Sequence, residues 1–210
     1  MLTEQSVSTF LDELASHSPA PGGGSVAALA GALGAALTSM VCQLTIGKKK
    51  YAEVEPEMKR ILGKSEELRR VITKLVDKDS EAFKKVMEAY GLPKDSEDQK
   101  ALRTAAIQGA AKEATLVPLE VMKHCIDGIA MAKIVAEKGN TNSLSDAGVS
   151  ALMFHAACES AALNVRINLS GIHDSEFVGW KSEELVTLLR TSKNMSDEIC
   201  ARVDAAISPS

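Results

Sequence analysis

The stretch SPAPGGGSVAALAGALGAALTSM, residues 18–40, decides the fold of this chain. It joins a break rich in proline and glycine to a long run of small apolar residues, and residues 14–47 contain no Asp, Glu, Lys or Arg. A helix without charge on any face is typical of a membrane span or of the centre of a helical bundle. Ala27, Gly31 and Ala35 recur at four-residue spacing, which gives a flat face that another helix approaches closely. Because alanine, glycine, serine and threonine dominate the run, we expect a buried central helix rather than a span.

The rest of the chain also has the pattern of helices. Aromatic residues make up 3% and hydrophobic residues 45% of the chain, so the core must be built from aliphatic side chains, which suits packed helices. No alternating run rich in Val, Ile and Thr predicts a strand. We expect an all-α fold of six to eight helices in one domain, residues 1–210, with Pro118 kinking or dividing one helix. The expected helices cover residues 4–16, 25–47, 57–90, 97–138, 146–169 and 174–207.

The length of these helices predicts an elongated bundle. Residues 57–90 would form a helix of roughly 50 Å, whereas a compact domain of this size is only about 35 Å across. Helices that outrun their domain usually pack in an elongated bundle or against a partner subunit. We therefore expect a multihelical elongated bundle that forms a homodimer.

Composition argues against several classes of function. The net charge of −4 gives no support for binding to nucleic acid or to an anionic membrane surface. The N-terminus carries acidic residues and no basic start, unlike a signal peptide. No pair of histidines has metal-ligand spacing, so no metal site is expected. Four dispersed cysteines without a CxxC pair predict free thiols in a reducing compartment, the cytoplasm: Cys42, Cys125, Cys158 and Cys200.

One carboxylate falls among the apolar positions of the segment 57–90. A heptad row runs through positions 61, 65, 68, 72, 75, 79, 82 and 86, and position 79 is Asp79. At 3.6 residues per turn, the same row leaves Asp77 and Glu81 towards solvent. A carboxylate in such a row is costly unless it is paired or hydrogen-bonded. Two interpretations stay open here: a structural salt bridge or helix cap, and a catalytic carboxylate with a perturbed pKa.

Three further polar groups interrupt apolar surroundings. The loop GNTNSLSD, residues 139–146, fits either ordinary capping by Ser143 and Asp146 or a helix start that faces a ligand. Asn164 and Asn168 lie four residues apart on one helix face, where amides bond a neighbouring backbone or bind a ligand. The cluster GKKKY, residues 47–51, suits the C-terminal dipole of the preceding helix or an acidic substrate tail.

Six ordered motifs together resemble the cyclodeaminase/cyclohydrolase family, which includes the C-terminal domain of formimidoyltransferase-cyclodeaminase and free-standing methenyltetrahydrofolate cyclohydrolases. The resemblance covers residues from about 7 to 175. The motifs are APGGGSVAALAGALGAALTSMVCQLTIGKKKY, VDKDSEAF, YGLPK, VPLEV, AEKGNTNSLSDAGV and ALNVRINL.

This resemblance implies a fold, a substrate and a set of site residues. It implies an all-helical, intertwined homodimer or higher homo-oligomer that acts on a folate, with no metal and no cofactor beyond the tetrahydrofolate substrate. It also implies that Asp79 is catalytic. The residues that it implies for folate binding are Gly22, Gly23, Gly24, Ser25, Lys48, Lys49, Lys50, Asn140, Asn142, Ser145, Asp146, Asn164 and Asn168.

Two related reactions fit the resemblance. A methenyltetrahydrofolate cyclohydrolase adds water to 5,10-methenyltetrahydrofolate and opens the ring to 10-formyltetrahydrofolate, whereas a formimidoyltetrahydrofolate cyclodeaminase releases ammonia from 5-formiminotetrahydrofolate. No formimidoyltransferase domain is attached, and MVCQLTIGKKKYAEVE and IVAEKGN look closer to the free-standing cyclohydrolases. We therefore expect the cyclohydrolase, with the cyclodeaminase as the alternative and a non-catalytic folate-binding or scaffold protein as a further one.

Overall fold

The computed structural model describes residues 1–208, and within them every regular element is a helix. This confirms the expected all-α fold. The six α-helices are α1 (Val7–Leu14), α2 (Gly23–Thr45), α3 (Glu55–Tyr90), α4 (Glu97–Lys138), α5 (Leu144–Leu169) and α6 (Ser175–Ile207). Three short 3₁₀ helices accompany them: η1 (Leu2–Glu4), η2 (Lys49–Tyr51) and η3 (Thr141–Ser143).

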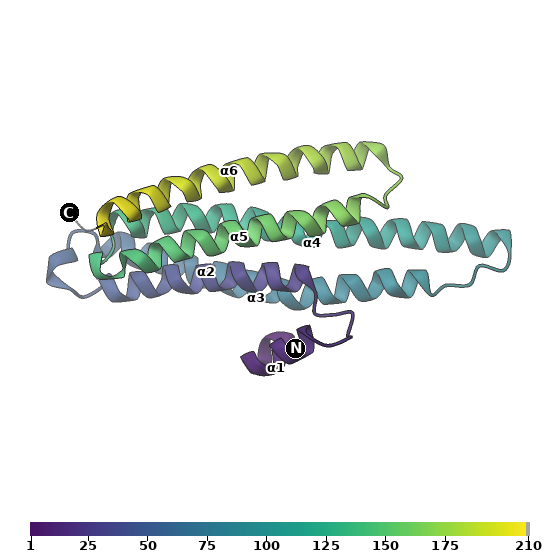
Figure 1. Cartoon of the computed structure of the whole chain (residues 1–210), viewed down its shortest axis with the longest axis horizontal. Helices are drawn as coiled ribbons and strands as arrows, with labels where there is room; N and C mark the ends of the chain where they lie inside the picture. Colours follow the sequence, from purple (N-terminus) through teal and green to yellow (C-terminus); the bar gives the residue numbers. More distant parts are fainter. Residues whose placement is uncertain (209–210) are drawn as a thin grey trace.

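Four long helices form the body of the molecule. Helices α2, α3, α4 and α5 pack side by side as a bundle, α6 lies on α4 and α5, and α1 stands apart beside the bundle (Figure 1). Helix α4 has 42 residues, which corresponds to about 63 Å. The bundle is therefore elongated, as the helix lengths predict, and its two ends are far apart.

Helix α4 continues through Pro118, so of the two predicted effects of this proline, a kink or a division, the division is wrong. Proline lacks an N–H, and the carbonyl four residues earlier, that of Ala114, therefore loses its helical donor. The side chain of Asn168 on α5 replaces that donor, since its Nδ2 donates to the Ala114 oxygen at 3.0 Å. Pro118 is itself buried between the buried residues Val117 and Leu119. Packing and one amide thus keep the helix whole.

Small residues let the helices of the bundle approach one another. Ala27 and Ala35 have no exposed surface and Gly31 is buried, which confirms the predicted flat face of α2. On the same helix Gly34 lies against the ring of Phe154, a fully buried side chain of α5. The other side of that ring lies against α4, and the glycine there, Gly128, leaves room for it.

Replacing Gly128 by alanine is expected to destabilise the fold by about 1–3 kcal/mol, because a β-carbon there would overlap the Phe154 ring. Gly109→Ala on the same helix is the matched control, since nothing lies within 4 Å of the position of its β-carbon. This control should leave the free energy of unfolding unchanged or raise it, because alanine favours a helix more than glycine does. Urea unfolding of the two variants and the parent measures the difference, and equal stabilities would contradict this packing.

Helix α2 is less central than its composition predicts. By length and composition α2 is long and apolar enough to cross a membrane. However, 61% of the apolar 18-residue stretch that makes it so is buried inside the protein. The remainder includes Leu33, Met40 and Leu44, which are 50%, 37% and 41% exposed. One side of α2 thus faces the core, as expected, whereas the other lies on the surface of the bundle.

Candidate functional site

Asp79 on α3 lies against the N-terminus of α2. Its Oδ2 is 3.0 Å from the hydroxyl of Ser25, which donates to it, and the backbone N–H of Ser25 also donates to the carboxylate. The Ser25 hydroxyl further lies 3.0 Å from the Val76 carbonyl and 3.1 Å from the Ser80 hydroxyl. The first turn of a helix has backbone N–H groups without helical partners, and its dipole favours a negative charge. Asp79 therefore serves as the acceptor that α2 needs at this end.

A glycine is required beside this carboxylate. A β-carbon on Gly24 would overlap Asp79 Oδ1, whereas one on Gly23 would meet the amide of Asn164 at 3.5 Å, an ordinary contact. Neither glycine has a positive φ, so the requirement at Gly24 is one of space. The triglycine thus brings the α2 backbone up to Asp79.

Burial raises the pKa of Asp79, and the hydrogen bonds from Ser25 partly oppose that rise. No basic side chain forms an ion pair with this carboxylate among residues 1–208, so the salt-bridge interpretation is wrong. The helix-cap interpretation is confirmed, because Asp79 accepts hydrogen bonds from Ser25 in the first turn of α2. The group is half-buried, hydrogen-bonded and open to a cavity. A carboxylate in this setting is a stronger base than an exposed one.

Asp79→Asn is expected to stabilise the fold at neutral pH, with a gain that disappears in acid. A raised pKa means that the folded state favours the protonated acid, so stability is full below the unfolded pKa and is lost as pH rises through the folded pKa. The uncharged amide avoids that loss. Melting temperatures between pH 3 and pH 8 measure the effect, with Glu81→Gln, an exposed carboxyl of α3, as the control for removing one charge. A gain that is equal at all pH values would contradict the prediction.

Asp79 opens onto a cavity of about 210 Å³. The side chains and backbone around it come from four segments: the turn before α2, the first turn of α2, α3 and the pair α4–α5. They are Pro19, Ala20, Gly22, Gly23, Gly24, Asp79, Ser80, Ala82, Phe83, Val86, Ala114, Asn164 and Asn168. Sites for drug-sized ligands usually measure ~300–1,000 Å³, so this cavity would enclose part of a larger ligand.

The two asparagines present acceptors to this cavity. Asn164 Nδ2 donates to the Ser160 carbonyl at 2.9 Å and Asn168 Nδ2 donates to Ala114, as described above. Within residues 1–208, no group donates a hydrogen bond to either Oδ1, and neither oxygen is a buried atom without a partner. Both amides are thus fixed in orientation by backbone carbonyls, and their oxygens stay available to a donor.

The other predicted site residues lie at the opposite end of α2. Helix α2 has 23 residues, so about 34 Å separates its glycines from Lys48, Lys49 and Lys50. The loop between α4 and α5 joins the lysine end: Asn140 donates to the Leu44 carbonyl, and the Tyr51 hydroxyl contacts Thr141.

The loop of residues 139–146 does not form the predicted capping box. Ser143 is the N-cap of α5 but accepts no side-chain hydrogen bond, so that capping interpretation is wrong. Asn140 instead accepts from the backbone N–H of Asn142, and Ser145 and Asp146 follow in the first turn of α5. Within one chain, the residues implied for folate binding therefore form two separate groups.

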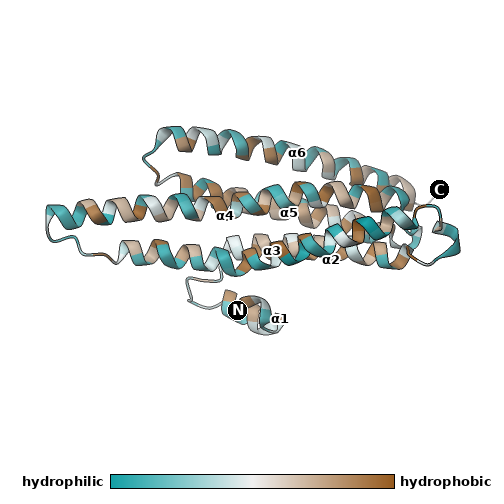
Figure 2. Ribbon diagram, turned by 180° about the vertical axis from the view of Figure 1, so that it is seen from behind, coloured by the Kyte–Doolittle hydropathy of each residue, from teal (hydrophilic) through white to brown (hydrophobic). Residues whose placement is uncertain are grey.

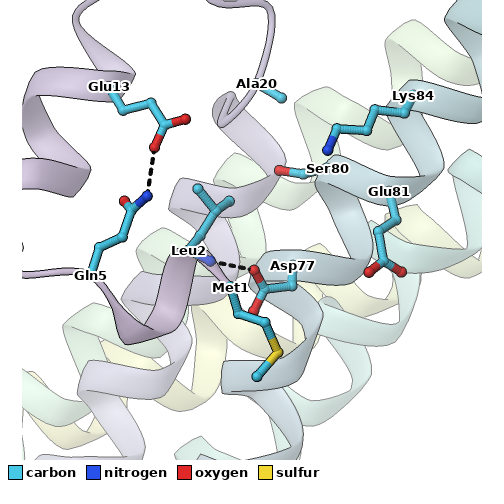
Figure 3. Close-up of a pocket in the computed structure, with 9 residues that line it drawn as sticks. All are labelled: Met1, Leu2, Gln5, Glu13, Ala20, Asp77, Ser80, Glu81 and Lys84. Atoms are coloured by element: carbon cyan, nitrogen blue, oxygen red, sulfur yellow. Dashed lines mark hydrogen bonds between the residues drawn. The ribbon is translucent and has the colours of Figure 1, made fainter.

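The N-terminal segment covers the neighbouring turn of α3. Asp77 accepts from the backbone N–H of Leu2 at 2.6 Å and from the Thr3 hydroxyl at 2.9 Å, so it does not face solvent as predicted. Figure 3 shows the contact between Leu2 and Asp77 beside a cavity of about 310 Å³, which Ser80 and Lys84 line from the same helix as Asp77. Ser80 also lines the Asp79 cavity. The segment before α2 thus forms one side of the site.

Sequence reasoning missed the apolar wall of the cavity. Phe83 and Val86 follow Asp79 by one and two helical turns, and the heptad row of α3 indicates the side on which they lie. Phe83 is 38% exposed although it is aromatic, which leaves a surface free for a flat ligand. No signal in the sequence indicates Ala114, because its place depends on how α4 packs. In residues 1–208, no three His, Cys, Asp or Glu side chains cluster as a metal site would require.

Comparisons with known proteins place this site in a family. Residues 6–187 match the family model described as Formiminotransferase-cyclodeaminase. A protein named Methenyltetrahydrofolate cyclohydrolase from Methylorubrum extorquens is 50% identical over 207 residues, covering 99% of this chain and all of that protein. The Formimidoyltransferase-cyclodeaminase of Rattus norvegicus is 33% identical over 97% of this chain, which spans only 38% of that longer protein.

A solved structure gives the same result for the fold. The crystal structure of formiminotetrahydrofolate cyclodeaminase from Thermotoga maritima matches with a TM-score of 0.81 and 36% identity, covering 99% of this chain and 98% of that one. Sequence and fold thus agree over nearly the whole chain, and the cavity beside Asp79 lies within the matched residues. The chain belongs to the formiminotransferase-cyclodeaminase family.

Proposed function

We propose that this protein is a methenyltetrahydrofolate cyclohydrolase, with Asp79 as its general acid and base. The observation that carries the proposal is the position of this carboxylate: half-buried, free of any ion pair within residues 1–208, and open to a cavity. The 50% identity with a full-length relative of that name supports the same activity.

The chemistry needs a base next to a cation. The methenyl carbon between N5 and N10 of the substrate carries a delocalised positive charge, and the Asp79 carboxylate stabilises that charge as the cation binds. Asp79 takes a proton from water as the water oxygen bonds to this carbon. It then gives that proton to N5 as the bond from N5 to the carbon breaks. The hydroxyl proton leaves to solvent, so water is consumed and one proton is released with 10-formyltetrahydrofolate.

The substrate itself supplies the electrophile in this scheme. We accordingly propose that no metal or further cofactor takes part, since the residues of the site have only to bind a cation and move one proton. The cavity is large enough for the reacting end of a folate, and Gly22, Gly23, Asn164 and Asn168 are proposed to contact it. The side-chain amide oxygens of Asn164 and Asn168 can accept hydrogen bonds from the N–H groups of a pteridine ring. Gly24 and Ser25 position Asp79 instead.

Cyclodeaminase activity is the second candidate. The observation that favours it is the name of the solved relative, a formiminotetrahydrofolate cyclodeaminase with 36% identity and nearly complete coverage. In that reaction N10 would attack the formimino carbon and ammonia would leave, with Asp79 moving the proton. The same cavity therefore serves both reactions, which share a tetrahedral carbon between N5 and N10.

Separate incubation with the two folates tests the proposal. With methenyltetrahydrofolate the enzyme is expected to accelerate the loss of the methenyl absorbance, whereas 5-formiminotetrahydrofolate should release ammonia much more slowly. Fast ammonia release without loss of the methenyl absorbance would establish the cyclodeaminase instead. Folate binding without turnover of either compound would establish the non-catalytic alternative.

We further propose a cytoplasmic homodimer. The four cysteines are free thiols and three of them are buried, which suits a reducing compartment. The apolar surface of α2 supports the association of two copies. Sedimentation of the purified protein tests the dimer, and a monomer at micromolar concentration would contradict it.

A further inference from the structure

The hydroxyl of Ser25 is the centre of a small hydrogen-bond cluster behind Asp79. Three oxygens surround it: Asp79 Oδ2 at 3.0 Å, the Val76 carbonyl oxygen at 3.0 Å and the Ser80 hydroxyl at 3.1 Å. Ser25 has no exposed surface, so its hydroxyl does not itself contact a ligand. Ser80 is also buried, yet it lines the Asp79 cavity. The cluster thus lies between the carboxylate and a second residue of the cavity wall.

The Ser25 hydroxyl has one proton and more acceptors than that proton can serve. A carbonyl oxygen and an ionised carboxylate only accept, so the proton goes either to Val76 or to Asp79. When Asp79 is ionised, Ser25 donates to it and Ser80 can donate to Ser25. When Asp79 is protonated, it donates to Ser25 instead. The Ser25 proton is then free for the Val76 carbonyl or the Ser80 hydroxyl, so the protonation of Asp79 sets the direction of this chain of hydrogen bonds.

The contact between α2 and α3 around the cluster is apolar. Helix α3 carries both hydrophilic and hydrophobic residues along its length (Figure 2), and Ile72, Leu75 and Val76, which precede the cluster, are buried. Aliphatic side chains offer a proton no acceptor. A proton on Asp79 therefore has two exits, the Asp79 cavity and the Ser25 hydroxyl.

The chain of hydroxyl groups ends at a second cavity. Ser80 lines both the Asp79 cavity and the neighbouring cavity of about 310 Å³ beside the N-terminal segment (Figure 3). Glu81 and Lys84, which also line this second cavity, are exposed, so it opens to solvent. A polar space of this volume has room for several water molecules. Asp79, Ser25 and Ser80 thus connect the interior of the site to the water outside it.

The proposed reaction needs such a path once in every turnover, because it releases one proton. After Asp79 has protonated N5 it is ionised again, and it can take the remaining hydroxyl proton as the formyl carbonyl forms. At that point the reacting end of the product occupies the cavity of about 210 Å³ and separates Asp79 from water on that side. Burial raises the pKa of Asp79, so the carboxyl group holds this proton more firmly than an exposed one would.

We propose that Ser25 and Ser80 form a proton relay that returns Asp79 to its ionised form while the product is still bound. The proton on Asp79 Oδ2 passes to Ser25 Oγ, and the Ser25 proton passes to Ser80 Oγ. The Ser80 proton then passes to water in the second cavity. Each step breaks one O–H bond and forms another, so one proton enters the chain and one leaves it. Rotation of the two hydroxyl groups restores the starting arrangement. The relay rests on the function proposed above.

Substitution of Ser80 separates a relay from a packing role. Ser80→Ala removes the hydroxyl and is expected to lower kcat on the order of tenfold at unchanged KM, less than loss of the general acid and base itself. Ser80→Thr keeps the hydroxyl and should restore most of the rate. If Ser80 only filled space, the smaller alanine would be tolerated better than the larger threonine. That order of rates would contradict the relay.

The matched control is Ser65→Ala, which removes another buried hydroxyl from α3. The Ser65 hydroxyl lies 2.7 Å from that of Ser39, about 21 Å along the helix from Asp79. This variant should retain the kcat and the KM of the parent. A loss in Ser65→Ala as large as that in Ser80→Ala would assign both effects to packing and overturn the relay.

The release of the proton can be followed directly. Enzyme in excess is mixed with methenyltetrahydrofolate in weak buffer, and the methenyl absorbance is recorded together with a pH-indicator dye. In the parent and in Ser65→Ala, one proton per substrate should appear as fast as the absorbance falls. In Ser80→Ala the absorbance should fall at close to the parental rate. The proton should appear on the order of tenfold more slowly, when departure of the product opens the cavity.

Failure of the relay and failure of the proposed function give different results in this experiment. A parent that does not consume methenyltetrahydrofolate would refute the proposed function and the relay with it. An active parent, together with simultaneous absorbance loss and proton release in Ser80→Ala, would overturn the relay alone and leave the proposed function intact.

Discussion

Asp79→Asn is expected to lower kcat for methenyltetrahydrofolate by about 10²–10⁴-fold, the contribution that one positioned general acid and base usually makes. The amide has nearly the shape of the carboxylate, and its oxygen still accepts from Ser25, but it cannot take a proton from water. It also removes the negative charge beside the cation. Steady-state rates from the loss of the methenyl absorbance measure the effect.

The matched control for this variant is Asp77→Asn, on the same helix two residues earlier. Asp77 bonds the N-terminal segment and does not line the Asp79 cavity, so its variant should retain a rate close to that of the parent. Binding of the product 10-formyltetrahydrofolate, which lacks the cationic carbon, should persist in Asp79→Asn within a few fold when measured by calorimetry. A parental rate in Asp79→Asn would refute the catalytic role and leave the protein as a folate binder.

The heptad row predicts Asp79 because burial of one helix face follows from local periodicity. Ile61, Ser65, Leu68, Ile72 and Leu75 are all buried as that row requires, so position 79 points towards the same neighbours. Periodicity cannot show which element meets the carboxylate. That element is the first turn of α2, more than fifty residues earlier, and only packing places it there.

Other parts of the site depend on contacts that no local pattern contains. The carbonyl of Ala114 needs a donor because of Pro118, and Asn168 provides it from another helix. From the sequence, Pro118 and Asn168 predict a helix break and a polar face, and neither indicates the other. The order of the motifs likewise cannot show that Lys48 lies far from the triglycine, because it does not give the distance between the two ends of a helix. The length of α2 sets that distance.

Gly24→Ala is expected to lower kcat/KM by at least about 10²-fold, because displacement of a catalytic group by roughly 1 Å can cost that much. The added β-carbon would overlap Asp79 Oδ1, so the carboxylate must move away from α2 and lose its bonds from Ser25. Gly23→Ala, one residue earlier in the same turn, adds the same methyl group at an ordinary 3.5 Å from Asn164. That control should retain most of the activity.

A double-mutant cycle separates a shifted carboxylate from a blocked substrate. If Gly24→Ala acts through Asp79, it should cost little further activity in the Asp79→Asn background, because the group it displaces has already lost its function. If the methyl group instead obstructs the folate, the two losses should multiply and KM should rise in both backgrounds. The family resemblance implies that Gly24 binds folate, whereas non-additive losses would show that it is needed to make room for the enzyme's own base.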